Sequence, residues 1–380
     1  MKKILKYCLF CLVVFFCIGC QNIISNNNSI EYDIDCHIIQ WKSANEFEIK
    51  DIFKNVYYVI LQDDSIDSMI HEIDKIVIEN DRIYILDSNS PAALLVFDIN
   101  GRFLHRISQR GNGPGEYVRF INFTVIENDE VLVYDVSKRV IMKFDKNGDF
   151  IHSIDSKFEI RDFTNISNGQ FLLSLKMHES NTFRKKVLLT DDFFNDGDYF
   201  FTYDKNFKDN KFNLVTFQPF GDKVGYLYPI SDTLFIFDLK GRLIESWFFD
   251  FGRRKMPEKY KNDFIKAAAD ERNGKNSYVY ISETPVCFKN YIFSQISVDG
   301  QNGIMVYDKE KDKMAYEILS IETFCMNNIY FPMYNIADSI LVSYINSDTY
   351  MILKDKITVV EEVSSHLENG GTVITFFSIE

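Results

Sequence analysis

The residues best suited to chemistry lie in a glycine-rich stretch from Gln109 to Tyr117, with the sequence QRGNGPGEY. Glycines allow close backbone approach to a ligand and a positive φ, and exposed N–H groups can meet an anion. The spacing is neither a Walker loop nor a dinucleotide fingerprint, because no strand–turn–helix context surrounds it. The alternative is a rigid turn in which Glu116 accepts hydrogen bonds from backbone donors. The candidate ligand-binding residues are Arg110, Gly111, Gly113, Gly115, Glu116, Tyr117 and Arg119.

Two aspartates at the ends of predicted strands, Asp87 and Asp135, are further candidates for ligand binding. Carboxylates that meet at one face can hold a hard cation such as calcium. More often, such aspartates cap turns through their side chains. The stretch from Asp145 to Asp149 imitates the start of a calcium loop, but Ser156 stands at the twelfth position, where an acidic residue is needed. No cofactor is assigned, calcium is the one candidate that these carboxylates suggest, and no metal ligands are assigned.

Other catalytic signatures are missing from the sequence. There is no Gly-x-Ser-x-Gly elbow, and none of the six histidines pair as His-x-x-x-His. After residue 20, only Cys36, Cys287 and Cys325 remain, without a Cys-x-x-Cys pair. Three cysteines in so long a chain are no disulfide framework, so free thiols are expected, although one bridge is possible. No catalytic residue is assigned, but ligands far apart in the sequence are still compatible with a metal site.

A repeat of 46 or 47 residues determines where these residues lie. We measure the repeat between the residues that stand at the tight turn after an apolar strand in each unit, which we call the markers. The interval between the fourth and fifth markers is longer and holds Met256 to Asn276, where apolar residues follow helical spacing. We expect a short helical insertion there. The markers are Asp98, Asp145, Asp191, Asp238, Asp308 and Lys354.

Each repeat is expected to form four short strands. In the first unit these are 75–79, 82–87, 94–98 and 103–107, with turn dipeptides between them. Four strands in about 45 residues are typical of a propeller blade. The predicted fold is an all-β, six-bladed β-propeller with four-stranded antiparallel blades and one short helical insertion. A two-layer sandwich is the alternative. Spare strands at 57–61 and 372–379 could each complete the last blade.

The first twenty residues read as an export signal. Lysines precede a short apolar stretch that ends at Cys17-Ile-Gly-Cys20, which resembles a lipobox with Cys20 as the lipidated residue. An ordinary cleaved signal peptide and a retained membrane helix are the alternatives. We expect residues 1–20 to be a lipoprotein signal peptide, 21–50 a tether and N-terminal segment, and 51–380 the propeller. The net charge of −13 argues against nucleic-acid binding and against attachment to anionic lipid.

Two stretches carry a family resemblance: Ile73–Asp87, and Gln109–Tyr117 with its Gly-Asn-Gly-Pro-Gly-Glu-Tyr core. They resemble six-bladed β-propeller lipoproteins of Bacteroidetes, relatives of the NHL-repeat propellers, over nearly all of the mature chain. The third unit, Phe163–Phe201, departs from the pattern because it lacks the turn glycine. The resemblance implies the fold, export and lipidation, and no settled reaction. Because no acidic residue directly follows Cys20, it also implies an outer-membrane lipoprotein that faces the periplasm.

The sequence favours a lipid-anchored, non-enzymatic binding or scaffold module, expected to be a monomer. Its ligand would be a glycan, a peptide or a protein partner, held by one face of the ring and its central channel. The alternative is a metal-assisted lyase or hydrolase with its site in the channel. A third interpretation is the extracytoplasmic part of a sensor. Fold alone does not decide between them.

Overall fold

The computed structural model describes residues 34–53, 55–88, 92–167, 169–178, 181–192, 194, 196–208, 215–228, 230–263, 266, 269–270, 277–318, 334–337, 340–355 and 357–378. The expected signal peptide with Cys20 lies outside the described residues, as do Cys325 and residues 271–276 of the expected helical insertion.

The first repeat unit forms one antiparallel sheet of four consecutive strands. They are β3 (Lys75–Glu79), β4 (Arg82–Asp87), β5 (Ala93–Asp98) and β6 (Phe103–Ile107). The turns need backbone conformations that Asn, Asp and Gly tolerate: Asn80 and Asp81 have φ of 49° and 59°, and Gly101 has φ of 86°. The four strands predicted for this unit are confirmed, with one residue of difference at the start of β5.

The next two units form sheets of the same kind, again with the strands in chain order. The second contains β7 (Phe120–Val125), η2 (Glu127–Asp129), β8 (Val131–Asp135), β9 (Val140–Phe144) and β10 (Phe150–Asp155). The third contains β11 (Ile160–Ser167), β12 (Gln170–Leu175), β13 (Lys185–Thr190) and β14 (Gly197–Thr202). The departure of the third unit from the sequence pattern therefore does not change its architecture.

The fourth and fifth units form one curled, mixed sheet of ten strands, a connection that the repeat did not predict. A single residue pair, Phe220 and Cys287, joins its two halves. One half contains β15 (Phe217–Phe220), β16 (Lys223–Tyr226), β17 (Thr233–Phe237), β18 (Leu243–Asp250) and β1 (Asp35–Gln40). The other contains β19 (Val279–Ile281), β20 (Val286–Phe288), β21 (Tyr291–Val298), β22 (Gln301–Asp308) and β23 (Lys313–Ile318). Between the halves lie η3 (Gly252–Arg254) and α2 (Glu258–Lys261), so part of the expected insertion is helical.

The last sheet unites the two ends of the described chain. It contains β24 (Tyr334–Ala337), β25 (Ile340–Asn346), β26 (Thr372–Ser378) and β2 (Asn55–Ile60). Both spare strands therefore enter this sheet. The repeat marker at Lys354 was wrong, because α4 (Ser347–Leu353) and α5 (Glu361–Glu368) stand where a strand and turn were expected. Asn346 caps α4 by accepting a hydrogen bond from Thr349 N (2.9 Å), which turns the chain into a helix.

The segment before β2 packs along the outer side of three units. β1 pairs in parallel with β18, Glu46 N donates to Met314 O on β23 (3.1 Å), and η1 (Ile49–Ile52) lies between the last two units. Ile49 and Ile52 are buried in a cluster with Phe288 and Phe377. The expected tether, 21–50, thus includes a packed portion from residue 35 onward.

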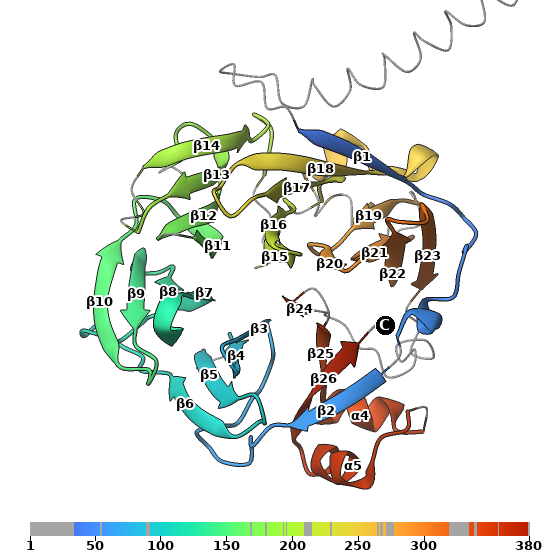
Figure 1. Cartoon of the computed structure of the whole chain (residues 1–380). Coiled ribbons are helices and arrows are strands. Elements are labelled where there is room, and N and C mark those ends of the chain that lie inside the picture. Colours follow the sequence, from blue (N-terminus) through green and yellow to red (C-terminus); the bar gives the residue numbers. More distant parts are fainter. Residues whose placement is uncertain are drawn as a thin grey trace, which may run out of the picture.

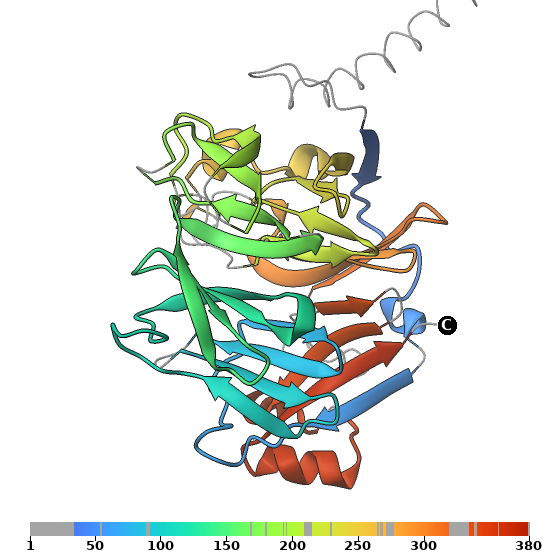
Figure 2. The ribbon, with the colours of Figure 1, turned by 60° about the vertical axis from the view of Figure 1, so that its left-hand side comes forward.

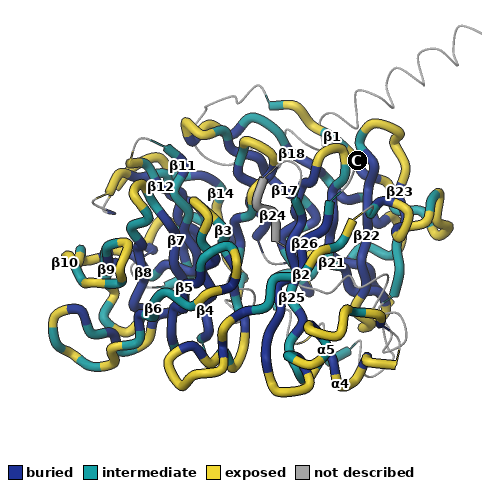
Figure 3. The backbone as a smooth tube through the Cα atoms, turned by 60° about the horizontal axis from the view of Figure 1, so that its bottom comes forward, coloured by how far each residue is buried: buried dark blue, intermediate teal, exposed yellow. Residues whose placement is uncertain are grey.

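The sheets stand around a common centre, and the strands nearest to it are β3, β7, β11, β15, β20 and β24 (Figure 1). Seen from the side, α4 and α5 lie outside the ring (Figure 2). Buried stretches follow the strands, and exposed residues gather at the turns (Figure 3). The core fills the spaces between neighbouring sheets: Tyr84 and Leu94 of the first sheet, for example, pack with Phe123 and Val133 of the second.

Candidate functional site

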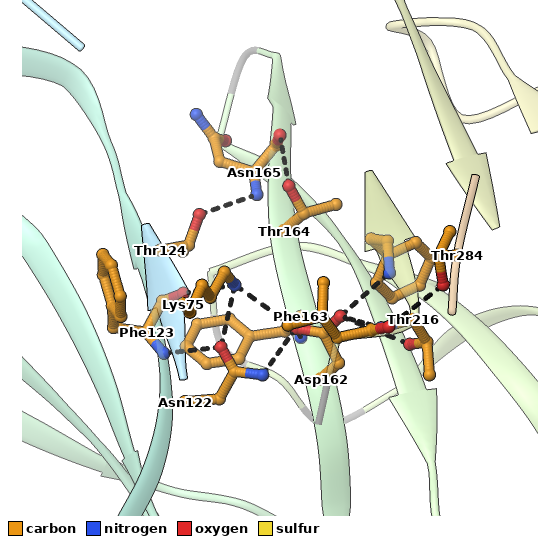
Figure 4. Close-up of polar contacts among 12 residues, drawn as sticks. Lys75, Asn122, Phe123, Thr124, Asp162, Phe163, Thr164, Asn165, Thr216 and Thr284 are labelled. Carbon is orange, nitrogen blue, oxygen red and sulfur yellow. Dashed lines mark hydrogen bonds and ion pairs between the residues drawn. The ribbon is translucent and has the colours of Figure 1, made fainter. Parts of the chain in front are cut away.

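One face of the ring collects the loops that lead from the outer strand of a unit to the inner strand of the next; we call it the connecting face. At its centre, the inner strands share a buried polar cluster of Lys75, Asn122, Asp162 and Thr216, which we call the central network (Figure 4). Asn122, Asp162 and Thr216 are fully buried. Lys75 begins β3, Asn122 and Asp162 are the third residues of β7 and β11, and Thr216 directly precedes β15.

Asn122 and Asp162 occupy equivalent positions because both strands bulge. The pairing register shifts between Phe120 and Asn122 in β7, and between Ile160 and Asp162 in β11. In each case, the side-chain Oδ1 accepts a hydrogen bond from the next backbone N–H, at 2.8 Å. A bulge re-aims the side chain at its site. The paired bulges turn both polar side chains toward the centre of the ring.

Lys75 supplies the positive charge of the central network. Its Nζ donates to Asn122 Oδ1 (2.8 Å) and Phe123 O (2.9 Å), and lies 3.4 Å from Asp162 Oδ1. It also lies 5.3 Å from the centroid of the Phe123 ring, within the range of a cation–π contact. A buried charge is tolerated only when it is paired and hydrogen-bonded, and all these contacts meet that condition.

Asp162 joins the network to the fourth unit. Its Oδ2 accepts from Thr216 N (2.6 Å), Phe217 N (2.9 Å) and Thr216 Oγ1 (3.3 Å), while Asn122 Nδ2 donates to Oδ1 (2.7 Å). Thr284 Oγ1 adds a bond to Val215 O (3.0 Å) and so connects the fifth unit. Because donors and acceptors are matched within the protein, the network fixes the inner strands relative to one another.

Sequence reasoning missed the central network, although the repeat offered a signal. Lys75 and Asn122 are 47 residues apart, one repeat period. A polar residue at this phase of an otherwise apolar inner strand, in two successive units, predicts that the side chains meet at the centre. Asp162 stands 40 residues after Asn122. Because this second interval is shorter than the repeat period, the relation was hidden.

The glycine-rich loop lies on the connecting face and is closed on itself. Gly113 N donates to Glu116 Oε2 (2.8 Å), and Gly111 N donates to Tyr117 O (2.8 Å). A Cβ on Gly111 would lie 2.0 Å from Glu116 Oε2, so only glycine leaves room for this carboxylate. Gly115 has φ of 77° and lies against Phe150. This is the geometry of the rigid-turn alternative, with Glu116 bonded to the turn.

Of the other predicted residues of this loop, Tyr117 is buried and Arg119 is exposed. Tyr117 packs on Phe120 with ring centroids 4.7 Å apart, and its hydroxyl donates to Ala92 O in the first unit. Burial raises the pKa of Tyr117 to about 12. The backbones of Arg110 and Tyr117 form an isolated parallel β-bridge. The loop thus locks the first two units together through Tyr117.

Asp135 lies directly against the loop. It accepts hydrogen bonds from Val118 N (2.6 Å) and Ser137 N (2.8 Å). At the equivalent end of β4, Asp87 accepts from His71 N (2.8 Å) and lies 3.1 Å from His71 Nδ1. Both carboxylates organise turns on the connecting face. In the described part of the chain, no three His, Cys, Asp or Glu side chains are placed to hold a metal ion.

The repeated aspartates at the opposite ends of the sheets are turn residues. Asp145 Oδ1 accepts from Asn147 N (2.8 Å) and Asp149 N (2.9 Å), and these backbone donors lower the pKa of Asp145. Asp98 and Asp238 make the same pair of bonds to residues two and four positions later. The interpretation of these aspartates as hairpin residues is confirmed. Cys36 and Cys287 are free thiols, exposed and buried respectively.

A groove of about 470 Å³ opens at the rim of the ring, where β1 and β18 end. The two strands are parallel, so Gln40 and Asp250 end side by side on the connecting face. We call it the rim groove. Sequence reasoning did not predict it, because one of its sides is formed by the end of β1 and the residues that follow. It is lined by Gln40, Trp41, Ser43, Asp250, Phe251, Gly252, Arg253 and Arg254.

Comparison with known proteins gives a family and a fold. The model of the family described as "Domain of unknown function (DUF4934)" matches residues 32–369. The crystal structure of a presumed exported protein of Bacteroides fragilis is 17% identical, with a TM-score of 0.74 over 90% of this chain and 99% of that chain. A DUF4221 member from Bacteroides vulgatus is 10% identical, with a TM-score of 0.50 over 87% and 97%. No curated protein matches the sequence.

Among the described residues, no helix is long and apolar enough to cross a membrane.

Proposed function

This chain belongs to the DUF4934 family, and we propose that it is a six-bladed β-propeller that acts as a binding module of the cell envelope. Six blades follow if the ten-stranded sheet is divided at its single joining pair, Phe220 and Cys287. The other four sheets each count as one blade. The similarity to the Bacteroides fragilis structure supports the fold.

Export and lipidation are part of the proposal. The sequence up to Cys20 supports them, and so does the presumed export of the Bacteroides fragilis protein. We propose an outer-membrane lipoprotein facing the periplasm. Replacing Cys20→Ser is expected to shift the chain from the membrane fraction to the soluble fraction and to abolish its labelling by a fatty acid. Unchanged membrane retention without a lipid would contradict the proposed anchor.

The observation that carries the binding role is the rim groove on a rigid face. The central network ties the inner strands of the first four units, and the glycine-rich loop locks the first two. A pre-formed site on such a frame loses little free energy to reorganisation when a ligand binds. The rim groove falls within the usual volume range of small-molecule sites, roughly 300–1,000 Å³, and presents aromatic and charged side chains. A glycan, a peptide or a protein segment are the ligand classes it could accept.

Thermal unfolding of the purified chain with a panel of oligosaccharides, peptides and divalent cations tests the binding role. A ligand that binds only the folded chain raises the melting temperature, increasingly so with its concentration. We expect at least one oligosaccharide or peptide to do so and to be recovered unchanged. Cleavage of an oligosaccharide that requires an added divalent cation would instead support the metal-assisted lyase or hydrolase.

A further inference from the structure

We propose that the rim groove binds an oligosaccharide that carries carboxylate groups. The inference rests on the proposed binding function and specifies the ligand of that site. Three features of the groove lead to it: an aromatic floor, an unpaired guanidinium, and neutral or acidic groups suited to hydroxyls.

Trp41 provides the aromatic floor. Its ring is half-buried and fixed by Tyr316 and Phe251, with centroids 4.4 Å and 5.9 Å away. Its backbone N donates to Asp250 O (2.9 Å), which holds the segment after β1 against the end of β18. A large ring that is already immobile offers contact area at low entropic cost, and its flat face suits the apolar face of a sugar ring.

Two arginines give the groove its preference for an anion. Arg254 is held by Asp299 Oδ1 (2.5 Å) and Ser277 Oγ (3.4 Å) and is about one-third exposed. Arg253 is exposed, and in the described part of the chain it has no polar partner. Guanidinium groups bind carboxylates through two parallel hydrogen bonds. With Lys255, these residues form the basic run that stands out in a chain of net charge −13.

The remaining groups favour a sugar over a bare anion. Asp250 Oδ1 accepts from Gly252 N (2.9 Å), and no partner for its other oxygen is found among the described residues. That oxygen can accept a hydrogen from a sugar hydroxyl, a donor that a bare anion does not offer. The side chains of Gln40 and Ser43 are exposed at the same place and add neutral donors and acceptors. Hydroxyls and a carboxylate on one ring are the chemistry of a uronic acid.

A fluorescence titration of the full chain with tetragalacturonate tests the inference, because the chain has only two tryptophans. Trp247 is buried and stacked on His37 at 4.2 Å, so a ligand in the groove should change the emission of Trp41. We expect a saturable change that Trp41→Phe abolishes. Maltotetraose, a neutral tetrasaccharide, should bind at least tenfold more weakly.

Arg253→Gln should weaken tetragalacturonate binding about tenfold, the size of one lost charge-assisted hydrogen bond. Arg253 is exposed, so this variant should fold normally. Arg242→Gln is the matched control: it is an exposed arginine on the same sheet, in the hairpin at the opposite end, and should leave binding unchanged. Absence of saturable binding would overturn the inference that the chain binds an acidic sugar. Binding that Arg253→Gln leaves unchanged would overturn the assignment of the rim groove as the binding site. Neither result would affect the panel that tests the binding function itself.

Discussion

The central network buries two opposite charges where several hydrogen-bond partners surround them. Lys75 is the first residue of β3 and Asp162 the third of β11, and backbone N–H groups and Asn122 complete their hydrogen bonds. Breaking such a pair costs more than the pair contributes, because the remaining charge stays buried. The central network is therefore expected to be the most mutation-sensitive polar cluster of the ring.

Asp162→Ala should lower the free energy of unfolding by about 3–5 kcal/mol, because Lys75 and two backbone donors lose their acceptor. Urea denaturation followed by circular dichroism measures this change. Asp222→Ala is the control at an exposed aspartate, where a change within about 0.5 kcal/mol is expected. Equal effects of the two variants would show that the central network contributes nothing to stability.

Gly111→Ala should destabilise the glycine-rich loop, because the added Cβ takes the place of the Glu116 carboxylate. The expected loss is about 1 kcal/mol, because the partly buried carboxylate gives up its hydrogen bond from Gly113 N. A double-mutant cycle with Glu116→Ala separates the steric part from the rest. If the two effects simply add, the carboxylate is not the group that excludes the methyl.

Lys186 is expected to make stability depend on pH above neutrality. Burial lowers its pKa to about 8 from 10.5, and its Nζ lies 4.6 Å from the centroid of the Tyr228 ring. Because the unfolded chain holds this proton more tightly, the stability of the wild type relative to Lys186→Met should rise as the pH increases from about 8 to 10.5. Urea midpoints of wild type and Lys186→Met across this window measure the difference. Parallel curves would show that the pKa of Lys186 is not lowered.

At the scale of elements, strands were predictable from the sequence where characteristic turn residues delimit them. Asn80-Asp81 and Asn100-Gly101 adopt positive φ where hairpins need it, so the strands of the first unit were predictable almost to the residue. β1 was not, since it pairs in parallel with a strand about 210 residues away and polar residues precede it. Helices α4 and α5 were missed because the repeat marker imposed a strand on their positions.

Ile49→Ala should show that the N-terminal segment is part of the core. Ile49 is 1% exposed and packs with residues of the last two units, so its truncation should cost about 2–5 kcal/mol. Ile38→Ala, in β1 of the same segment, is the control: this side chain is 40% exposed and should cost much less. Equal denaturation midpoints for the two variants would mean that the segment is a tether after all.

At the scale of the whole molecule, the residues that hold the ring together are different from the residues that line the proposed binding site. The candidate residues chosen from local spacing, such as Glu116, Asp87 and Asp135, are bonded to backbone donors and shape the connecting face. The rim groove arises only when β1 lies beside β18, segments that are distant in sequence. Local motifs could therefore predict the face, whereas the groove depends on long-range pairing that one sequence does not reveal.

Hydrogen exchange of the full chain, with and without saturating tetragalacturonate, tests the central claim that a rigid ring presents its ligand site at the rim groove. We predict slow exchange in β3, β7 and β11 in both states, and added protection by the ligand only at residues 40–43 and 250–254. Protection centred on the glycine-rich loop or on the central network, or no protection at any segment, would contradict the account.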